Sequence, residues 1–408
     1  MRVDTKVTIF DGPLDWFHDQ TRKHSPESFF LLVASADRNT IRVLGRDDVE
    51  EEPEYVGVAH VAAESNDFAS LTDSSISNFA GLVRRYRPQY LYLHNPPTQV
   101  RTQLTRLIPD LEVRTHDYPS FTREHLRAFD DEFRSRLVGQ ARAREKLLAA
   151  LYALSAPKRD RPFVAMLYGP SGVGKTETAM LLSELAGGDL LRAQFSMYNS
   201  DKFSSYVFGG SHSEPSLALD LLNRGSNVVL IDEFDKAHSS FYSAFYQLFD
   251  GGQFVDKNYS VDVGPALILC TSNFGSEKEI QDALGDALFS RFDAVIAYEE
   301  LNAAQVGEVT RRIIAGAVDD LTPEEAKVID KGDLERRLKP LTQHPGNVRR
   351  LRKLIDEFVS RTLVRAFLSD NLNPAEAKPR TRSEAKRSPQ FPGDELAGSN
   401  LPDLGSPQ

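Results

Sequence analysis

The sequence has only one cysteine, Cys270, among its 408 residues. A single cysteine excludes an internal disulfide and any zinc site built from several thiolates. Because Cys270 stands in the apolar run ALILC, we expect a buried structural thiol without a catalytic role. The nine histidines show no HExxH pattern or other short metal-binding spacing, so the metal that we expect is Mg²⁺ accompanying a nucleotide.

Long apolar runs, basic charge and targeting signals are also lacking. No apolar run reaches the about 18 residues needed to cross a bilayer, and the N-terminus has no secretory signal, so we expect a cytoplasmic protein without membrane contact. The net charge of −10 argues against extended contact with nucleic-acid backbone. Short basic pieces such as residues 84–85 leave nucleic-acid binding as a minority hypothesis.

What is present is an ordinary globular composition, with 40% hydrophobic residues and a mean hydropathy of −0.38. The length suits two or three domains. In the first part of the chain, apolar runs predict strands at residues 29–35, 55–62, 90–94 and 111–114, and apolar residues three or four apart predict helices at 75–86 and 98–108. This pattern predicts a small α/β domain over residues 1–120.

Two polar strings in this domain follow predicted strands. They are HNPP at residues 94–97 and THDYPS at residues 115–120. Both could line a site, but Asn, Asp and Pro are the usual residues of turns, so we favour a turn-forming role.

Four further segments follow. A helix at residues 121–136 is predicted to link two domains, and residues 137–298 then alternate strands and helices in the order of a parallel sheet. Residues 299–370 are predicted to be mostly helical. Residues 371–408 are rich in Pro, Ser, Gly and mixed charge, which predicts a disordered tail.

The string GPSGVGKT at residues 169–176 lies between a buried-strand pattern, FVAMLY, and a helical pattern, ETAMLLSELA. Glycines in such a loop let backbone N–H groups wrap a phosphate, and the helix N-terminus adds positive charge. Lys175 would reach the β- and γ-phosphates and Thr176 would bind Mg²⁺. The residues predicted to hold the phosphates are Gly169, Pro170, Ser171, Gly172, Val173, Gly174, Lys175 and Thr176.

An apolar strand pattern, VVLIDEFDK at residues 228–236, ends in two acids. Asp232 is predicted to complete the Mg²⁺ shell together with Thr176, and Glu233 to polarise the attacking water. A third apolar run, ALILCTSN at residues 266–273, ends in Asn273 at the same sheet edge, where it could orient the water or the γ-phosphate. A solvated strand end and a turn-forming Asn are the plainer alternatives.

Together with the sequence around them, these strand ends resemble the AAA+ ATPases. The resemblance is greatest to the second ATPase module of Clp-type unfoldases and disaggregases, to which the torsins are related. The likeness extends from residue 137 to about residue 368. LVGQ at residues 137–140 resembles the entry motif beside the adenine pocket, which implies that Val138 contacts the nucleotide. DEFDKAH at residues 232–238 and TSNFGS at residues 271–276 also resemble the family. The implied fold is an AAA+ P-loop parallel sheet with a C-terminal helical lid, preceded by the small α/β domain.

The resemblance implies two arginines of the ATPase site. FSRFD at residues 289–293 is similar to the family's finger motif, so Arg291 is expected to reach the γ-phosphate of a neighbouring subunit in a six-membered ring. GNVRRLRKLI at residues 346–355 resembles the lid segment and puts Arg349, rather than Arg350, at the second sensor position.

Two features depart from the family. The stretch at residues 204–219 is shorter than the family's aromatic grip loop. Tyr206 and Phe208 could serve as grips, but the packed segment before that loop is the preferred assignment for them. No peptidase-docking loop is seen, and the N-terminal domain does not resemble that of the family.

We therefore expect an enzyme that binds ATP with Mg²⁺ and hydrolyses it, in a Clp-type ring that remodels or unfolds protein clients. One alternative is a nucleotide-switched assembly or scaffold protein that threads nothing. Another is the motor of a nucleic-acid or anti-phage system. The sequence leaves the client and the role of the N-terminal domain open.

Overall fold

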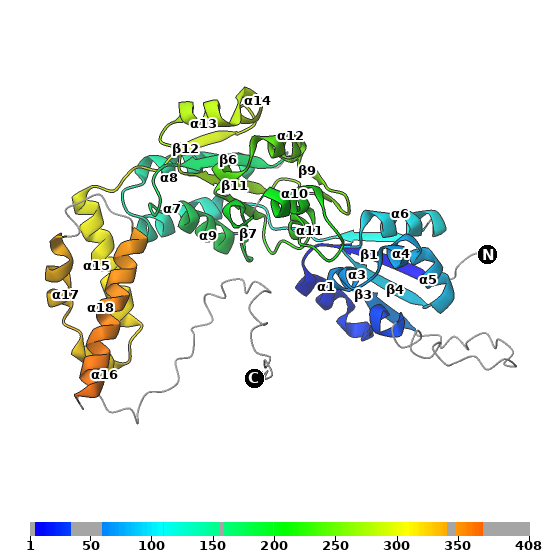
Figure 1. Ribbon diagram of the computed structural model, residues 1–408, viewed down its shortest axis with the longest axis horizontal. Helices are drawn as coiled ribbons and strands as arrows, with labels where there is room; N and C mark the ends of the chain where they lie inside the picture. The colour runs from blue at the N-terminus through cyan, green and yellow to red at the C-terminus, as the bar shows by residue number, and fades with distance from the viewer. Residues whose placement is uncertain are drawn as a thin grey trace, which may run out of the picture. The chain divides into compact units, whose positions relative to one another are not determined.

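A computed structural model of the protein describes residues 5–33, 59–108, 110–155, 159–198, 200–340 and 348–369 (Figure 1). Over these ranges the chain forms two parallel five-stranded sheets, a small antiparallel hairpin and surrounding helices. None of the helices in these ranges combines the length and the apolar character that a membrane crossing requires. The predicted tail at residues 371–408 lies outside the described residues.

The first sheet has the strand order β2-β3-β4-β1-β5, and every neighbouring pair is parallel. Its strands are β1 (Lys6–Asp11), β2 (Glu27–Ser28), β3 (His60–Ala63), β4 (Tyr90–His94) and β5 (Glu112–Thr115). Its helices are α1 (Leu14–Thr21), η1 (Arg22–His24), α3 (Ser65–Ala69), α4 (Asp73–Ser77), α5 (Phe79–Tyr86) and α6 (Thr98–Leu107). Alternation along β1 sends Val7 and Ile9 into the core formed with α3 to α6, while Phe10 packs against Phe17 of α1 on the other face.

The predicted strand at residues 29–35 is wrong. Strand β2 ends at Ser28, and residues 29–33 are helical. Phe29 and Val33 are buried while Leu31 between them is 66% exposed, which is the spacing of one helix face. Tertiary packing of Phe29 against Phe79, with ring centroids 5.1 Å apart, therefore overrides the strand propensity of the run.

Other predicted helices and strands of this domain agree more closely with the structure. β4 and α6 lie where the pattern put them, and β5 is shifted by one residue. The predicted helix at residues 75–86 is divided at Asn78 into α4 and α5, because Asn favours helix ends over helix interiors. Of the predicted strand at residues 55–62, the structure describes only the end, where β3 begins at His60. β1 was not predicted.

The second sheet has the order β12-β6-β11-β8-β7 and is also parallel throughout. Its strands are β6 (Phe163–Tyr168), β7 (Leu191–Gln194), β8 (Val228–Asp232), β11 (Leu267–Ser272) and β12 (Ala294–Ala297), and the hairpin is β9 (Gln253–Val255) with β10 (Ser260–Asp262). The predicted strands at residues 163–168, 228–232 and 266–273 correspond to β6, β8 and β11. The predicted α/β fold class is confirmed.

Both faces of this sheet are covered, as parallel sheets require. Alternate residues of β6, β8 and β11 enter two different hydrophobic clusters, one holding Val164 and Ile231 and the other holding Ala165 and Leu230. Cys270 is fully buried in the first cluster, and burial raises the pKa of its thiol. The predicted burial of Cys270 is confirmed.

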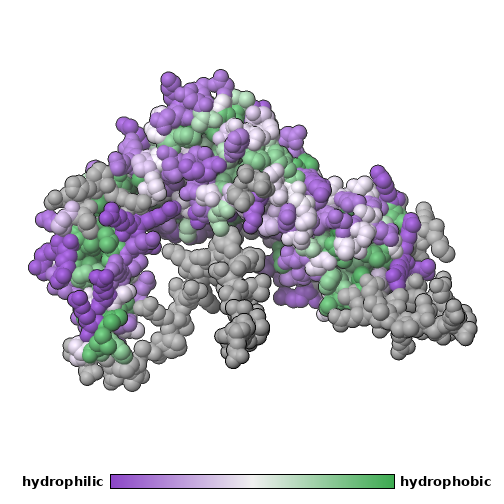
Figure 2. Space-filling view, in the orientation of Figure 1, coloured by the Kyte–Doolittle hydropathy of each residue, from purple (hydrophilic) through white to green (hydrophobic). Residues whose placement is uncertain are grey.

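The helices around this sheet are α7 (Arg123–Arg136), α8 (Ala141–Leu154), α9 (Lys175–Leu185), η2 (Phe195–Met197), α10 (Ser200–Phe208), α11 (Leu217–Leu222), η3 (Phe234–Lys236), η4 (Ser239–Ala244), α12 (Phe245–Gly251), α13 (Glu277–Leu284) and α14 (Asp286–Phe289). Thr122, the N-cap residue before α7, forms a capping box with His125. α13 buries only Ile280 and Leu284, and the surface over it in Figure 2 is mostly hydrophilic.

The remaining helices are α15 (Ala303–Asp319), α16 (Pro323–Val328), α17 (Lys331–Leu338) and α18 (Val348–Leu368). By packing, the chain divides into two compact units, one with Met1–Thr310 and Lys339–Leu351 and the other with Arg311–Leu338 and Arg352–Gln408. The described part of the second unit is helical and has its own core, which includes Ile314, Leu334 and Ile355. The predicted domain boundaries stay predictions.

Candidate functional site

The loop between β6 and α9 has the backbone conformation of a phosphate cradle. Gly169, Gly172 and Gly174 all have positive φ, at 130°, 80° and 110°. A Cβ on Gly169 would lie 2.2 Å from the backbone oxygen of Tyr298, and one on Gly174 would lie 2.4 Å from a side-chain carbon of Leu137. Only glycine therefore permits this close-packed loop, which ends at the N-terminus of α9.

Lys175, the first residue of α9, is buried and turns back over the loop. Its Nζ donates hydrogen bonds to the carbonyl oxygens of Gly169 at 2.5 Å and Pro170 at 2.8 Å, and to Oδ1 of Asn273 at 3.3 Å. Burial lowers the pKa of Lys175 to about 8, and the opposing effect of Asp232 is smaller. The ammonium thus lies at the centre of the predicted site.

Asp232 ends β8 with its side chain almost completely buried. Its Oδ1 accepts a hydrogen bond from Oγ1 of Thr271 on β11. Its Oδ2 accepts two hydrogen bonds from Arg192 of β7, from Nε at 2.9 Å and Nη2 at 2.5 Å. Asp232 is therefore not the solvated strand end of the plainer reading, since a buried carboxylate needs such partners.

Glu233 follows Asp232 in the left-handed region, with φ of 57°. Its backbone N–H donates to Oγ1 of Thr271 at 2.9 Å, which fixes the turn by a bond from the neighbouring strand. A positive φ at a non-glycine residue costs of order 1 kcal/mol or more and is concentrated at functional sites. The turn carries the Glu233 carboxylate away from the buried strand and leaves it partly exposed.

Asn273 follows β11, one strand away from both the loop and Asp232. β11 pairs with β6 on one side and β8 on the other, so the carboxyl ends of the three strands meet. The Lys175 ammonium bonds to Asn273, and the charges of Asp232 and Glu233 act on the pKa of Lys175, so the four side chains lie near one another at this edge. This edge is where parallel sheets bind ligands.

The entry string at residues 137–140 joins α7 to α8. Leu137 packs under the phosphate loop at Gly174, and Gln140 exchanges two hydrogen bonds with the backbone of Glu299, from Nε2 at 2.8 Å and to Oε1 at 3.0 Å. Val138 is partly exposed between these anchored neighbours. Its contact with a nucleotide stays a prediction.

Arg291 has different neighbours from the loop residues. Its Nε donates to Oδ2 of Asp250 at 2.9 Å, and its guanidinium lies 4.4 Å from the ring centre of Tyr246. Neither partner belongs to the predicted phosphate site of this chain. The role of Arg291 at the γ-phosphate of a neighbouring subunit stays a prediction.

Arg349 stands in the first turn of α18, is exposed and belongs to the first compact unit. Its charge contributes to lowering the pKa of Lys175, so the two cations are within electrostatic range of each other. Arg350, the alternative weighed from the sequence, is also exposed. The sensor role of Arg349 stays a prediction.

The two candidate grip residues separate in the structure. Tyr206 is 2% exposed, donates a hydrogen bond to Oδ2 of Asp220 at 2.7 Å and stacks on Tyr198. Phe208 is 42% exposed at the end of α10, beside Phe241. Tyr206 is therefore part of the packed core, as the preferred assignment of both residues to the packed segment predicts. Phe208, in contrast, is exposed to solvent.

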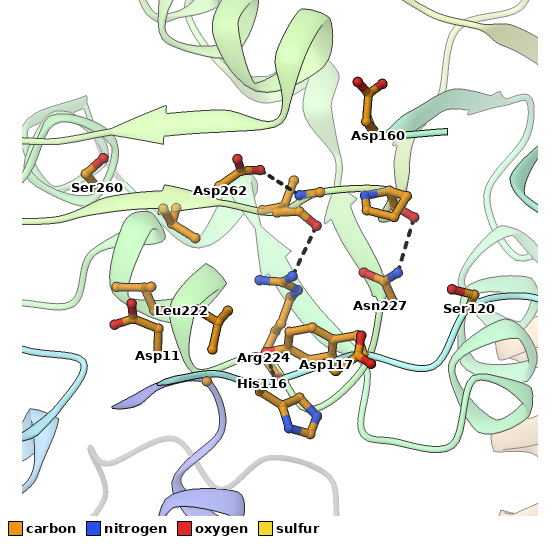
Figure 3. Close-up of a pocket in the computed structure, with 17 residues that line it drawn as sticks. Asp11, His116, Asp117, Ser120, Asp160, Leu222, Arg224, Asn227, Ser260 and Asp262 are labelled. Carbon is orange, nitrogen blue, oxygen red and sulfur yellow. Dashed lines mark hydrogen bonds between the residues drawn. The ribbon is translucent and has the colours of Figure 1, made fainter. Parts of the chain in front are cut away.

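A separate cavity of about 470 Å³ lies away from the phosphate loop (Figure 3). Thr115, His116, Asp117, Tyr118 and Ser120, from the second polar string of the N-terminal domain, line it. Figure 3 also shows four surrounding aspartates, Asp11, Asp117, Asp160 and Asp262, and one buried arginine, Arg224. This excess of carboxylates is opposite to what a phosphate site requires. None of the predicted phosphate-binding residues lines the cavity.

Two polar residues at the phosphate edge were missed from the sequence. Arg192 lies in the unremarkable string LLRAQ, and its role is visible only once β7 is known to pair with β8. Thr271 stands within the predicted apolar run at residues 266–273. A hydroxyl near the end of a central strand, next to the strand that carries the acids, was the signal that could have identified it.

Comparison with known proteins agrees with this geometry. Residues 161–313 match the family model described as AAA domain (Cdc48 subfamily). Chaperone protein ClpB of Yersinia enterocolitica is 35% identical over 156 residues, covering 35% of this chain and 17% of that protein. Chaperone protein ClpD of Arabidopsis thaliana chloroplasts is 27% identical over 305 residues, covering 62% and 31%. A ClpA homolog protein of Fuscovulum blasticum is 26% identical over 287 residues, covering 61% and 35%.

The glycine cradle, the buried acidic strand end and the family match together define an AAA-type P-loop module. More specifically, the chain contains a Clp-type AAA+ ATPase module, and the N-terminal domain is unassigned. The matches span from about a sixth to about a third of the length of these relatives.

Proposed function

We propose that the chain binds ATP with Mg²⁺ at the loop of residues 169–176 and hydrolyses it. The observation that carries this proposal is the meeting of Lys175, Asp232, Glu233 and Asn273 at the carboxyl ends of three adjacent parallel strands. A cationic, donor-rich loop suits phosphates, and acids beside it suit a hydrolytic site.

The residues present fit a magnesium ion. Thr176 at the start of α9 and the Asp232 carboxylate offer the hard oxygen donors that Mg²⁺ prefers. When bound, Mg²⁺ neutralises phosphate charge. The Lys175 ammonium would then exchange its bonds to the loop carbonyls for bonds to phosphate oxygens. Glu233 would accept the proton of the attacking water at its carboxylate, and Asn273 would orient that water.

We further propose that the chain works as a ring that remodels protein clients, with Arg291 completing the site of the next subunit. The likeness to chaperone proteins ClpB and ClpD supports this reading. One observation favours a second candidate, a nucleotide-switched assembly protein. The burial of Tyr206 removes one of the two aromatic residues that could grip a polypeptide.

Phosphate release from ATP tests hydrolysis. The natural chain should release phosphate, whereas Lys175→Ala should lose both binding and turnover. A matched control is Lys331→Ala, because Lys331 is half-exposed in α17 and its nearest carboxylate, in Asp319, is 3.9 Å away. Equal turnover by the natural chain and Lys175→Ala would refute this assignment of the site.

Sedimentation of the Glu233→Gln variant with and without ATP tests the ring. A shift to a larger species with ATP supports assembly. The Phe208→Ala substitution removes the remaining exposed aromatic residue of α10. If the variant still clears an aggregated client, the result would favour a nucleotide-switched assembly protein over one that threads polypeptide.

A further inference from the structure

Arg192 is a charged residue that contacts the acidic strand end but belongs to neither the phosphate loop nor the predicted motifs. It lies on β7, the edge strand of the second sheet, where Arg192 is paired with Leu230 and Gln194 with Asp232. Its side chain therefore runs diagonally across the sheet to reach Asp232. It is 36% exposed, whereas the Asp232 side chain is only 7% exposed.

The two ends of the Asp232 carboxylate have different partners. Oδ2 receives both hydrogen bonds from Arg192, at 2.9 and 2.5 Å, and Oδ1 receives the hydroxyl of Thr271. The direction of the carboxylate is thus also fixed by Thr271 and by the strand itself. What Arg192 alone supplies is a full positive charge, because a guanidinium stays protonated at any working pH.

We propose that the Arg192 guanidinium competes with Mg²⁺ for the Asp232 carboxylate and so sets the Mg²⁺ concentration at which nucleotide binds. The inference rests on the proposed Mg-ATP function. The Arg192 guanidinium and Mg²⁺ would both bind the Asp232 carboxylate and would therefore repel each other. The repulsion is strong because a partly buried site screens charge less than water does.

Removing Arg192 also has an effect of opposite sign, which is to weaken Mg²⁺ binding. Groups that hydrogen-bond to a metal-binding carboxylate often orient it, and removing them weakens metal binding by about 10–100-fold. Because Thr271 holds the other oxygen of Asp232, we expect the loss of orientation to be smaller than the loss of repulsion. The two effects have opposite signs, so a single titration separates them.

The test is a Mg²⁺ titration of binding of a fluorescent ATP analogue to the full chain and to Arg192→Gln. The half-maximal Mg²⁺ concentration should fall by about tenfold in the variant, since a competing charge has been removed. In EDTA, where no free Mg²⁺ is present, Arg192→Gln should bind the analogue no more tightly than the natural chain does. Arg22→Gln is the matched control, because Arg22 is 81% exposed and lies 3.8 Å from Asp19, and it should leave the titration unchanged.

A half-maximal Mg²⁺ concentration that is unchanged or higher in Arg192→Gln would overturn the inference. If that variant does not fold, Arg192→Lys is tested in its place. Because lysine is a shorter cation with a single charged point, it should lower the half-maximal Mg²⁺ concentration by a smaller factor. In the Asp232→Asn background the effect of Arg192→Gln should vanish, because the shared carboxylate is gone. A natural chain that binds no analogue at any Mg²⁺ concentration would contradict the proposed function itself.

Discussion

The affinity for ATP should depend on pH through Lys175. Burial lowers the pKa of this side chain from 10.5 to about 8. Below pH 8 the amine carries a positive charge, and above pH 8 it becomes neutral. Only the ammonium attracts phosphate, so affinity should be constant in the protonated range and decline as the pH rises through 8.

The magnitude follows from the protonated fraction. With a pKa of about 8, Lys175 is roughly nine-tenths protonated at pH 7 and roughly one-tenth protonated at pH 9. The dissociation constant should therefore rise about tenfold between these pH values, which corresponds to about 1.4 kcal/mol. Because bound phosphate favours the charged amine, binding at pH 9 should also take up about one proton per nucleotide.

Isothermal titration calorimetry at pH 7, 8 and 9, in buffers of different ionisation enthalpy, measures both quantities. Mg²⁺ is kept in excess throughout. Lys175→Arg is the control, because a guanidinium does not lose its proton in this range, so any binding that it retains should be independent of pH. A dissociation constant that stays level from pH 7 to pH 9 with no proton uptake would refute the reasoning.

Three further predictions concern the other predicted site residues and the aromatic pair. Glu233→Gln should bind ATP as the natural chain does but release little phosphate, as measured by binding and turnover side by side; lost binding would contradict the role of Glu233 as a base. Arg291→Ala should lose turnover by about 10³-fold or more while keeping ATP binding, and mixing it with Glu233→Gln subunits should restore activity if sites are shared. Tyr206→Ala should lower the free energy of unfolding by about 3–5 kcal/mol, against about 1 kcal/mol or less for Phe208→Ala, because only Tyr206 is fully packed. Equal effects of the two aromatic changes in denaturant unfolding would contradict the packing argument.

The central sheet was predictable because its strands are continuous apolar runs ending in polar residues. The pattern FVAMLY gives a strand buried on both faces, and β6 covers those six residues. The N-terminal domain was harder. Its helix at residues 29–33 reads as a strand in isolation, and only the packing of Phe29 against Phe79 decides its form.

Motifs identified the loop and the acids of the site but not the partners that fix them. Lys175 and Asp232 stand in strings whose chemistry is readable from residue type and spacing. Arg192 and Thr271 reach Asp232 from strands far away in sequence, so their roles depend on sheet order, which the sequence does not display. Electrostatic effects such as the lowered pKa of Lys175 depend on burial in the same way.

Residues 169–176 are proposed to form the ATP site. Equilibrium binding of ATP in excess Mg²⁺, measured for the natural chain and for Lys175→Ala under the same conditions, tests it most directly. We expect one ATP per chain for the natural protein and no measurable binding for the variant. Binding of equal strength to both, or to neither, would contradict it.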